Sequence, residues 1–163
     1  MAVVELTDLP AILPRYGALV GLDLGEKTIG VAVSDPMRMV ASPLELIRKT
    51  KFTDDAKALF KLMDHRQVAG VVIGLPVNMD ASEGPRAQSA RAFARNLLRL
   101  REVPIAFWDE RMSTMAVNRL LIDEADINRA RRAEVVDKMA AGWILQGALE
   151  RLRTLENQAP PPA

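Results

Sequence analysis

Residues 17–34, GALVGLDLGEKTIGVAVS, contain two apolar runs that are separated by the short polar link Gly25, Glu26 and Lys27. Apolar runs of this length on either side of such a link predict two strands joined as an antiparallel hairpin. Asp23 interrupts the first run, where a carboxylate is costly unless it is hydrogen-bonded, lies at the strand end or binds a metal ion. The stretch therefore predicts the centre of a sheet and a first candidate for a functional site.

The remainder of the chain alternates between strand and helix patterns. Residues 39–48 predict a third strand, placed near an edge by Pro43, and residues 70–75 and 103–108 predict two more, the former continuously apolar and central. Helices are expected over 86–100, 113–123 and 133–153, and Thr53 is expected to cap a further one. This order predicts an α/β protein with a ribonuclease H-like fold, a five-stranded mixed sheet flanked by helices.

The composition fits one compact domain. The chain has 163 residues, of which 49% are hydrophobic and 26% charged, with a net charge of +1. We expect a flexible extension over residues 1–16, where Pro10 and Pro14 argue against a regular element, a ribonuclease H-like domain over 17–154 and a Pro-rich tail over 155–163. Because no apolar run is long enough to span a bilayer and no secretion signal is evident, we predict a cytoplasmic location.

The residue types restrict the metal chemistry that the chain can perform. There is no cysteine and only one histidine, His65, so a thiolate site is excluded and a histidine-rich zinc site is disfavoured. Oxygen ligands from carboxylates favour Mg²⁺ or Mn²⁺.

Two further acids follow the strand predicted over 103–108. If this strand runs parallel to the first, Asp109 and Glu110 emerge at the same carboxyl edge of the sheet as Asp23. Pleating sends the two side chains to opposite faces, so that one joins Asp23 and Arg111 is the natural partner of the other. The pattern leaves open which of the two acids joins Asp23.

Asp137, early in the last predicted helix, is a third acidic candidate. Nearby Ala140 and Ala141 would let the helix approach a sheet closely, although a surface acid paired with Lys138 is the simpler interpretation of a single helical Asp. Carboxylates that converge at one sheet edge repel each other and so imply bound cations. Such a cluster with magnesium is suited to phosphodiester cleavage.

The loop after residues 70–75 is rich in Gly, Pro, Asn and Ser and enters the helix that contains Arg86. Backbone N–H groups at a helix start, together with Arg86, favour a phosphate-binding position. The alternative is an ordinary strand-to-helix connection.

Four motifs in this order are specific to one family. They are GLDLGEKTIGVAVSD (residues 21–35), VVIGLPVNMDASEGPRA (71–87), WDERMST (108–114) and VDKMAAGWILQGALE (136–150). Together they resemble the YqgF/RuvX family of Holliday-junction resolvase-like proteins and pre-16S rRNA nucleases, over roughly residues 17–153. Ala81 is one departure, since the family more often has glycine there.

This resemblance implies a metal-dependent nuclease, a hydrolase acting in maturation of the 5′ end of pre-16S rRNA. It assigns catalysis and the binding of Mg²⁺ or Mn²⁺ to three acids, Asp23, Glu110 and Asp137. We expect substrate contacts from four further residues, namely Asn78, Arg86, Arg111 and Lys138. The expected partners are pre-16S rRNA and ribosomal precursor particles, with no membrane, and the protein is expected to be a monomer or a weak homodimer.

Three alternatives remain. A Holliday-junction resolvase acting on four-way DNA needs a dimer with two-fold symmetry, for which the sequence shows no interface. A non-catalytic RNA- or ribosome-binding module is disfavoured because clustered carboxylates do not help to bind a polyanion. An ATP-binding protein of the actin and sugar-kinase type would need two such domains, whereas this chain supplies one.

Overall fold

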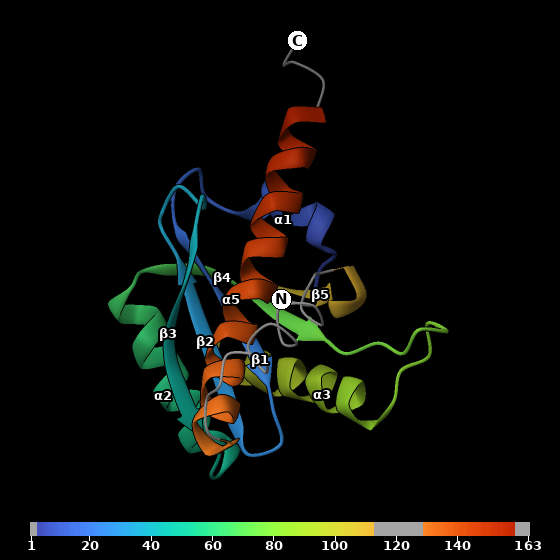
Figure 1. The fold of residues 1–163 in the computed structure, drawn as a ribbon. Helices are drawn as coiled ribbons and strands as arrows, with labels where there is room; N and C mark the ends of the chain where they lie inside the picture. Colours follow the sequence, from blue (N-terminus) through green and yellow to red (C-terminus); the bar gives the residue numbers. More distant parts are fainter. Residues whose placement is uncertain (1–2, 113–128, 159–163) are drawn as a thin grey trace.

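The computed structural model describes residues 3–112 and 129–158, apart from the side chains of residues 129–135, 137 and 138. A five-stranded sheet with the order β3-β2-β1-β4-β5 forms its centre (Figure 1). Strand β1 pairs antiparallel with β2 and parallel with β4, β2 pairs antiparallel with β3, and β4 pairs parallel with β5. The predicted mixed sheet is confirmed. Its strands are β1 (Ala18–Leu24), β2 (Thr28–Ser34), β3 (Ala41–Arg48), β4 (Val68–Leu75) and β5 (Ile105–Asp109).

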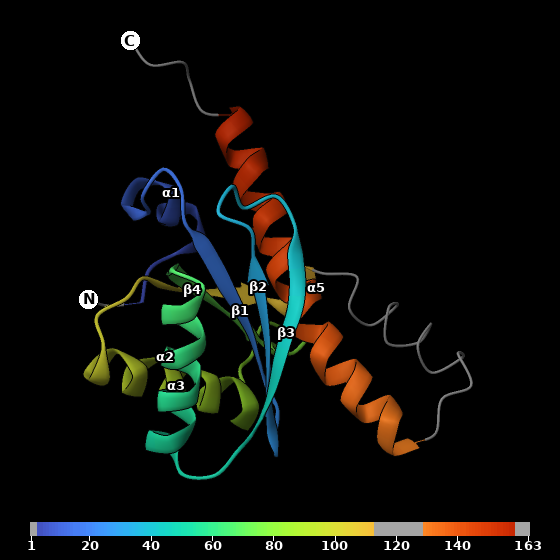
Figure 2. The same ribbon diagram turned by 90° about the vertical axis from the view of Figure 1, so that its left-hand side faces the viewer.

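Helices cover both faces of the sheet (Figure 2). Helices α2 (Phe52–His65) and α3 (Pro85–Leu100) lie on one face, and α5 (Arg129–Gln158) crosses the other. The core is accordingly divided in two. Leu59 of α2 and Leu97 of α3 are fully buried against one face of the sheet, and Leu145 of α5 is fully buried against the other. Within residues 3–112 and 129–158, no helix has both the length and the apolar character needed to cross a membrane.

Helix α5 approaches the sheet most closely at two glycines. A Cβ atom on Gly21 would lie 2.6 Å from the Cβ of Leu145 and 3.1 Å from the carbonyl oxygen of Ala141. A Cβ atom on Gly74 would overlap the Cδ1 of Ile144. Two neighbouring strands therefore lack side chains where the helix passes, and this sets the distance between helix and sheet.

The segment before Gly17 differs from the sequence-based expectation of no regular element. It contains a 3-10 helix, η1 (Leu6–Asp8), followed by the short helix α1 (Leu9–Ile12). Leu9 is fully buried in the core under α5, and the backbone N–H of Val4 donates to the carbonyl of Ile105 at 2.9 Å. The prolines do not prevent this, because a proline in the first turn of a helix removes no intrahelical hydrogen bond.

The predicted cap of α2 is wrong. The helix begins at Phe52, and its N-cap position is Lys51, which makes no capping hydrogen bond through its side chain. Instead, the carboxylate of Asp55 in the first turn accepts hydrogen bonds from the backbone N–H and the hydroxyl of Thr50, at 3.0 and 3.2 Å. The Asp55 carboxylate thus fixes the chain that enters the helix, and no side chain caps the helix at Lys51.

Helix α5 is longer than the predicted range 133–153 and extends to Gln158. No proline lies between the predicted end at Arg153 and Pro160, so no helix-breaking residue stops the helix at Arg153. The helix predicted over 113–123 and Pro160 lie outside the described residues.

Substituting Gly21 tests the close approach of α5. Gly21→Ala is expected to lower the free energy of unfolding by about 1–3 kcal/mol, because the added methyl must displace Leu145 or the backbone of α5. Thermal unfolding should show a fall in Tm of several degrees.

The matched control is Gly142→Ala in the same helix. A Cβ atom there meets only the ring of Pro43, at 3.7 and 3.8 Å, which is ordinary contact. Alanine at this helical position is expected to raise stability by about 0.5–1 kcal/mol. Equal effects of the two substitutions would contradict this account of the packing.

Candidate active site

Asp23 is a buried carboxylate at the carboxyl end of the central strand. It is the second-last residue of β1, is 5% exposed and pairs across the sheet with Gly30 of β2. Gly21, two residues earlier, faces α5, and side chains alternate along a strand, so Asp23 lies on the same face. The first predicted site residue is therefore directed into the space between the sheet and α5.

Glu110 reaches the same face from the end of β5. Its Oε1 atom lies 2.9 Å from the position that a Cβ atom on Gly74 would occupy, so its side chain extends back over β4. The register of β1 and β4, continued by one residue, places Gly74 beside Asp23, and neighbouring strands are about 4.8 Å apart. The structure thus brings Asp23 and Glu110 together, in a space that exists because Gly74 has no side chain.

Asp109 points to the opposite face of the sheet. The guanidinium of Arg111 donates to its carboxylate at 2.7 Å, and the backbone N–H of Arg111 adds a second hydrogen bond at 2.9 Å. Hydrogen bonding from Arg111 holds the pKa of the Asp109 carboxyl below its usual range, and Asp109 in turn raises the pKa of Arg111. Glu110, and not Asp109, is the acid that shares a face with Asp23.

Asp137 and Lys138 both lie in α5, but their side chains are outside the described part of the structure. The backbone of Asp137 is four residues, about one turn, before Ala141, where α5 passes over Gly21. Among the side chains that are described, no three acidic or histidine residues form a cluster able to hold a metal ion.

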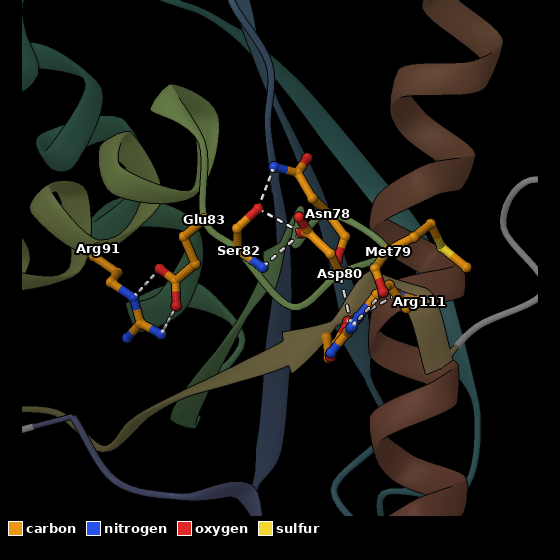
Figure 3. A network of polar contacts seen from close by, with 8 residues as sticks. Asn78, Met79, Asp80, Ser82, Glu83, Arg91 and Arg111 are labelled. Carbon is orange, nitrogen blue, oxygen red and sulfur yellow. Dashed lines mark hydrogen bonds and ion pairs between the residues drawn. The ribbon is translucent and has the colours of Figure 1, made fainter.

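Arg111 and Asn78 belong to one hydrogen-bond network (Figure 3). A guanidinium N–H of Arg111 donates to the carbonyl of Asn78 at 3.3 Å and to that of Met79 at 3.5 Å. The side-chain amide of Asn78 donates to the hydroxyl of Ser82 at 3.0 Å. Two residues that we expected to contact substrate therefore support the β4–α3 loop, defined here as residues 76–84.

Arg86 lies in the first turn of α3 and is exposed beside a cavity of about 470 Å³. Lys49 also lines this cavity and donates through Nζ to the carbonyl of Gly25 at 3.2 Å. Sequence reasoning missed Lys49, because only the pairing of β2 with β3 brings it next to the end of β1. One acid, Glu26, lines the cavity as well, so its ionisable lining consists of two cations and one anion. The two cations and the start of a helix favour phosphate groups there.

Ala81 has a backbone φ of 71°, in the left-handed region that glycine adopts most easily. The resemblance noted above has glycine more often at this position. Alanine in place of glycine at position 81 therefore adds backbone strain to the loop, and it removes no chemical group from the site.

Comparison with known proteins identifies relatives over most of the chain. The family model RuvX, described as Holliday junction resolvase, matches residues 17–151. A protein of Phenylobacterium zucineum is 80% identical over 156 residues, which are 95% of this chain and 100% of that protein. A protein of Caulobacter vibrioides is 68% identical over the same shares. Both carry the provisional name pre-16S rRNA nuclease.

Solved structures support the fold. Thermus thermophilus RuvC in complex with a Holliday junction substrate has a TM-score of 0.51 at 10% identity, covering 85% of this chain and 98% of that chain. A second structure of Thermus thermophilus RuvC has a TM-score of 0.50 at 11% identity, with coverages of 84% and 97%. This likeness concerns the fold alone and agrees with the predicted ribonuclease H-like arrangement.

Removing the Arg111 guanidinium is expected to loosen the β4–α3 loop. In Arg111→Met, amide hydrogen exchange across residues 76–84 should accelerate by up to about tenfold, because the hydrogen bonds to the carbonyls of Asn78 and Met79 are lost. The control is Arg101→Met, at the opposite end of α3 from the loop. This substitution removes a comparable exposed ion pair, in which the Arg101 guanidinium donates to the Asp64 carboxylate at 2.6 and 3.1 Å. Unchanged exchange in Arg111→Met would show that the loop does not depend on this residue.

Proposed function

The chain belongs to the RuvX family, and from this membership we propose that it is the metal-dependent nuclease that matures the 5′ end of pre-16S rRNA. The observation that carries the proposal is the placement of Asp23 and Glu110 on one face, at the carboxyl edge of the parallel strands β1, β4 and β5. Relatives that are 68% and 80% identical over their whole length carry the name of that activity. The expected place of action is the cytoplasm, on ribosomal precursor particles.

The residues at this edge suit a divalent metal ion. The donors are carboxylate oxygens, which match Mg²⁺ or Mn²⁺, and the missing side chain of Gly74 leaves room for the carboxylate of Glu110. We assign Asp23 and Glu110 as two ligands and Asp137 of α5 as the third. When bound, such an ion activates water as a nucleophile and stabilises charge on the leaving oxygen.

The chain's own residues position the substrate and the ligands. Burial of Asp23 in the sheet fixes its carboxylate, and Gly74 sets the path of Glu110. Arg86 and Lys49 hold phosphates of the RNA strand at the neighbouring cavity, a sequence-independent contact that fixes the register of the strand. Lys138 of α5 is assigned a phosphate contact of the same kind, while Asn78 and Arg111 act on the substrate through the loop that they support.

The first test is cleavage of a 5′-extended pre-16S RNA, and separately of a four-way DNA junction, with Mg²⁺ or Mn²⁺. Wild type should cut the RNA, chelation should abolish cutting, and Asp23→Asn should lower the rate on the order of 100-fold or more, because a ligand charge is lost. Asp55→Asn is the control, since Asp55 is a comparably buried acid (4% exposed) in α2 that lies outside the site. Cleavage of the junction alone would identify a resolvase instead, and cleavage of neither substrate by folded protein would remove the proposal.

A second test separates the roles of the adjacent acids. Glu110→Gln is expected to reduce the cleavage rate about as much as Asp23→Asn, because both remove a proposed ligand. Asp109→Asn should reduce it by only about tenfold or less, since Asp109 acts by holding Arg111 and the loop. A larger loss of cleavage rate in Asp109→Asn than in Glu110→Gln would show that Asp109 is the metal ligand and Glu110 is not.

A further inference from the structure

The β4–α3 loop is a small hairpin that projects from the sheet beyond α3 (Figure 1). Val77 and Glu83 form an antiparallel bridge at its base, and the backbone N–H of Asn78 donates to the carbonyl of Ser82 at 2.9 Å. Residues 79–81 form the tip. The loop therefore has a defined structure of its own and is more than a connection.

Met79 occupies this tip with an exposed apolar side chain. It is 88% exposed, the largest value among the exposed large hydrophobic side chains of the described residues. Its side chain points away from Ser82 and Glu83 (Figure 3). Isolated apolar residues are common on protein surfaces, so exposure by itself assigns no role to Met79.

The tip is held by polar contacts on both sides of Met79. The carboxylate of Asp80 accepts hydrogen bonds from the backbone N–H of Ser82, at 2.9 Å, and from its hydroxyl, at 2.5 Å. The Arg111 guanidinium donates to the carbonyls of Asn78 and Met79. A side chain on a loop that is ordered before binding incurs little further entropy loss when it contacts a ligand.

The base of the loop is fixed as well. Arg91 of α3 donates to both carboxylate oxygens of Glu83, at 2.5 and 2.7 Å, and this pairing lowers the pKa of Glu83. The loop is thus attached to α3 at one end and to the end of β5 at its tip.

The loop also begins next to the proposed active site. Arg111, which holds the carbonyl of Met79, directly follows Glu110 in the chain. The loop begins at Pro76, two residues after Gly74, against which the Glu110 carboxylate lies. An RNA strand whose scissile phosphate lies at Asp23 and Glu110 would therefore leave the site beside this loop. The apolar side chain of Met79 buries little surface in the fold, and an aromatic base is a suitable partner for it.

We propose that Met79 packs against a nucleobase next to the scissile phosphate and holds it out of its stack. This inference rests on the proposed function, because it takes the position of the strand from Asp23 and Glu110. Methionine inserts between bases in other nucleic-acid complexes, and its thioether contacts aromatic rings favourably. Met79 thus selects single-stranded or locally unpaired RNA, in which a base is free to leave its stack.

The test places 2-aminopurine, a base that becomes more fluorescent when unstacked, at single positions on either side of the cut in the precursor RNA. Binding is measured in EDTA, where no cleavage occurs. Binding of the wild-type protein should raise the fluorescence at one position. Met79→Ala should lose most of that rise and should bind the RNA about twofold to tenfold more weakly, as the loss of a sulfur–aromatic contact predicts. Met79→Leu should retain most of the rise.

The matched control is Met37→Ala, which removes another exposed methionine (60% exposed) from the β2–β3 connection at the opposite end of the sheet. It should behave as wild type, and neither alanine variant should alter Tm, because both side chains are exposed. Equal fluorescence and affinity in Met79→Ala and wild type would overturn the inference, as would failure of wild type to unstack any base.

Cleavage of the unmodified precursor in Mg²⁺ separates this inference from the proposed function. Cleavage by wild type together with an unaltered 2-aminopurine response in Met79→Ala rejects the base contact and leaves the nuclease assignment in place. A response that depends on Met79 in a protein that cuts no RNA supports the base contact and rejects the nuclease assignment.

Discussion

The close approach of α5 to the central strands is the constraint on which both the packing and the candidate site depend. The helix backbone passes over Gly21, and Ile144 fills the space above Gly74. The same missing side chain at Gly74 admits the carboxylate of Glu110 beside Asp23. Stability and the placement of the acids are therefore coupled. The space left by Gly74 is filled by Ile144 of the apolar core on one side and by the carboxylate of Glu110 on the other.

The pleat of β5 separates two adjacent acids that perform different tasks. Asp109 is neutralised by Arg111 on one face, and the pair supports the β4–α3 loop. Glu110 turns to the other face and joins Asp23. This division reduces the negative charge that must be balanced at the proposed metal site, and it connects the loop to the site through two consecutive residues, Glu110 and Arg111.

Features encoded by local patterns could be predicted from the sequence, and features that depend on tertiary contacts could not. The hairpin over residues 17–34 and the mixed sheet follow from apolar runs and short links, and with them the edge that Asp23 shares with Asp109 and Glu110. The pattern does not decide which of these two acids joins Asp23. The position of Lys49 beside Arg86 arises only when distant elements pack. The burial of Leu9 could not be predicted either, because two prolines in a segment of mixed polarity indicate a loop unless a core is present to receive it.

The contact between Val4 and β5 has a consequence for how the protein is made. The two segments are about 100 residues apart, so a growing chain on the ribosome carries the residues around Val4 long before Ile105 is synthesised. Until they meet, the outer edge of β5 presents unpaired backbone groups of the kind through which nascent chains aggregate. The opposite edge, β3, contains Pro43 and an irregular register and so discourages such pairing by itself. One end of the outer edge of β5 is therefore covered by a segment that lies outside the candidate site.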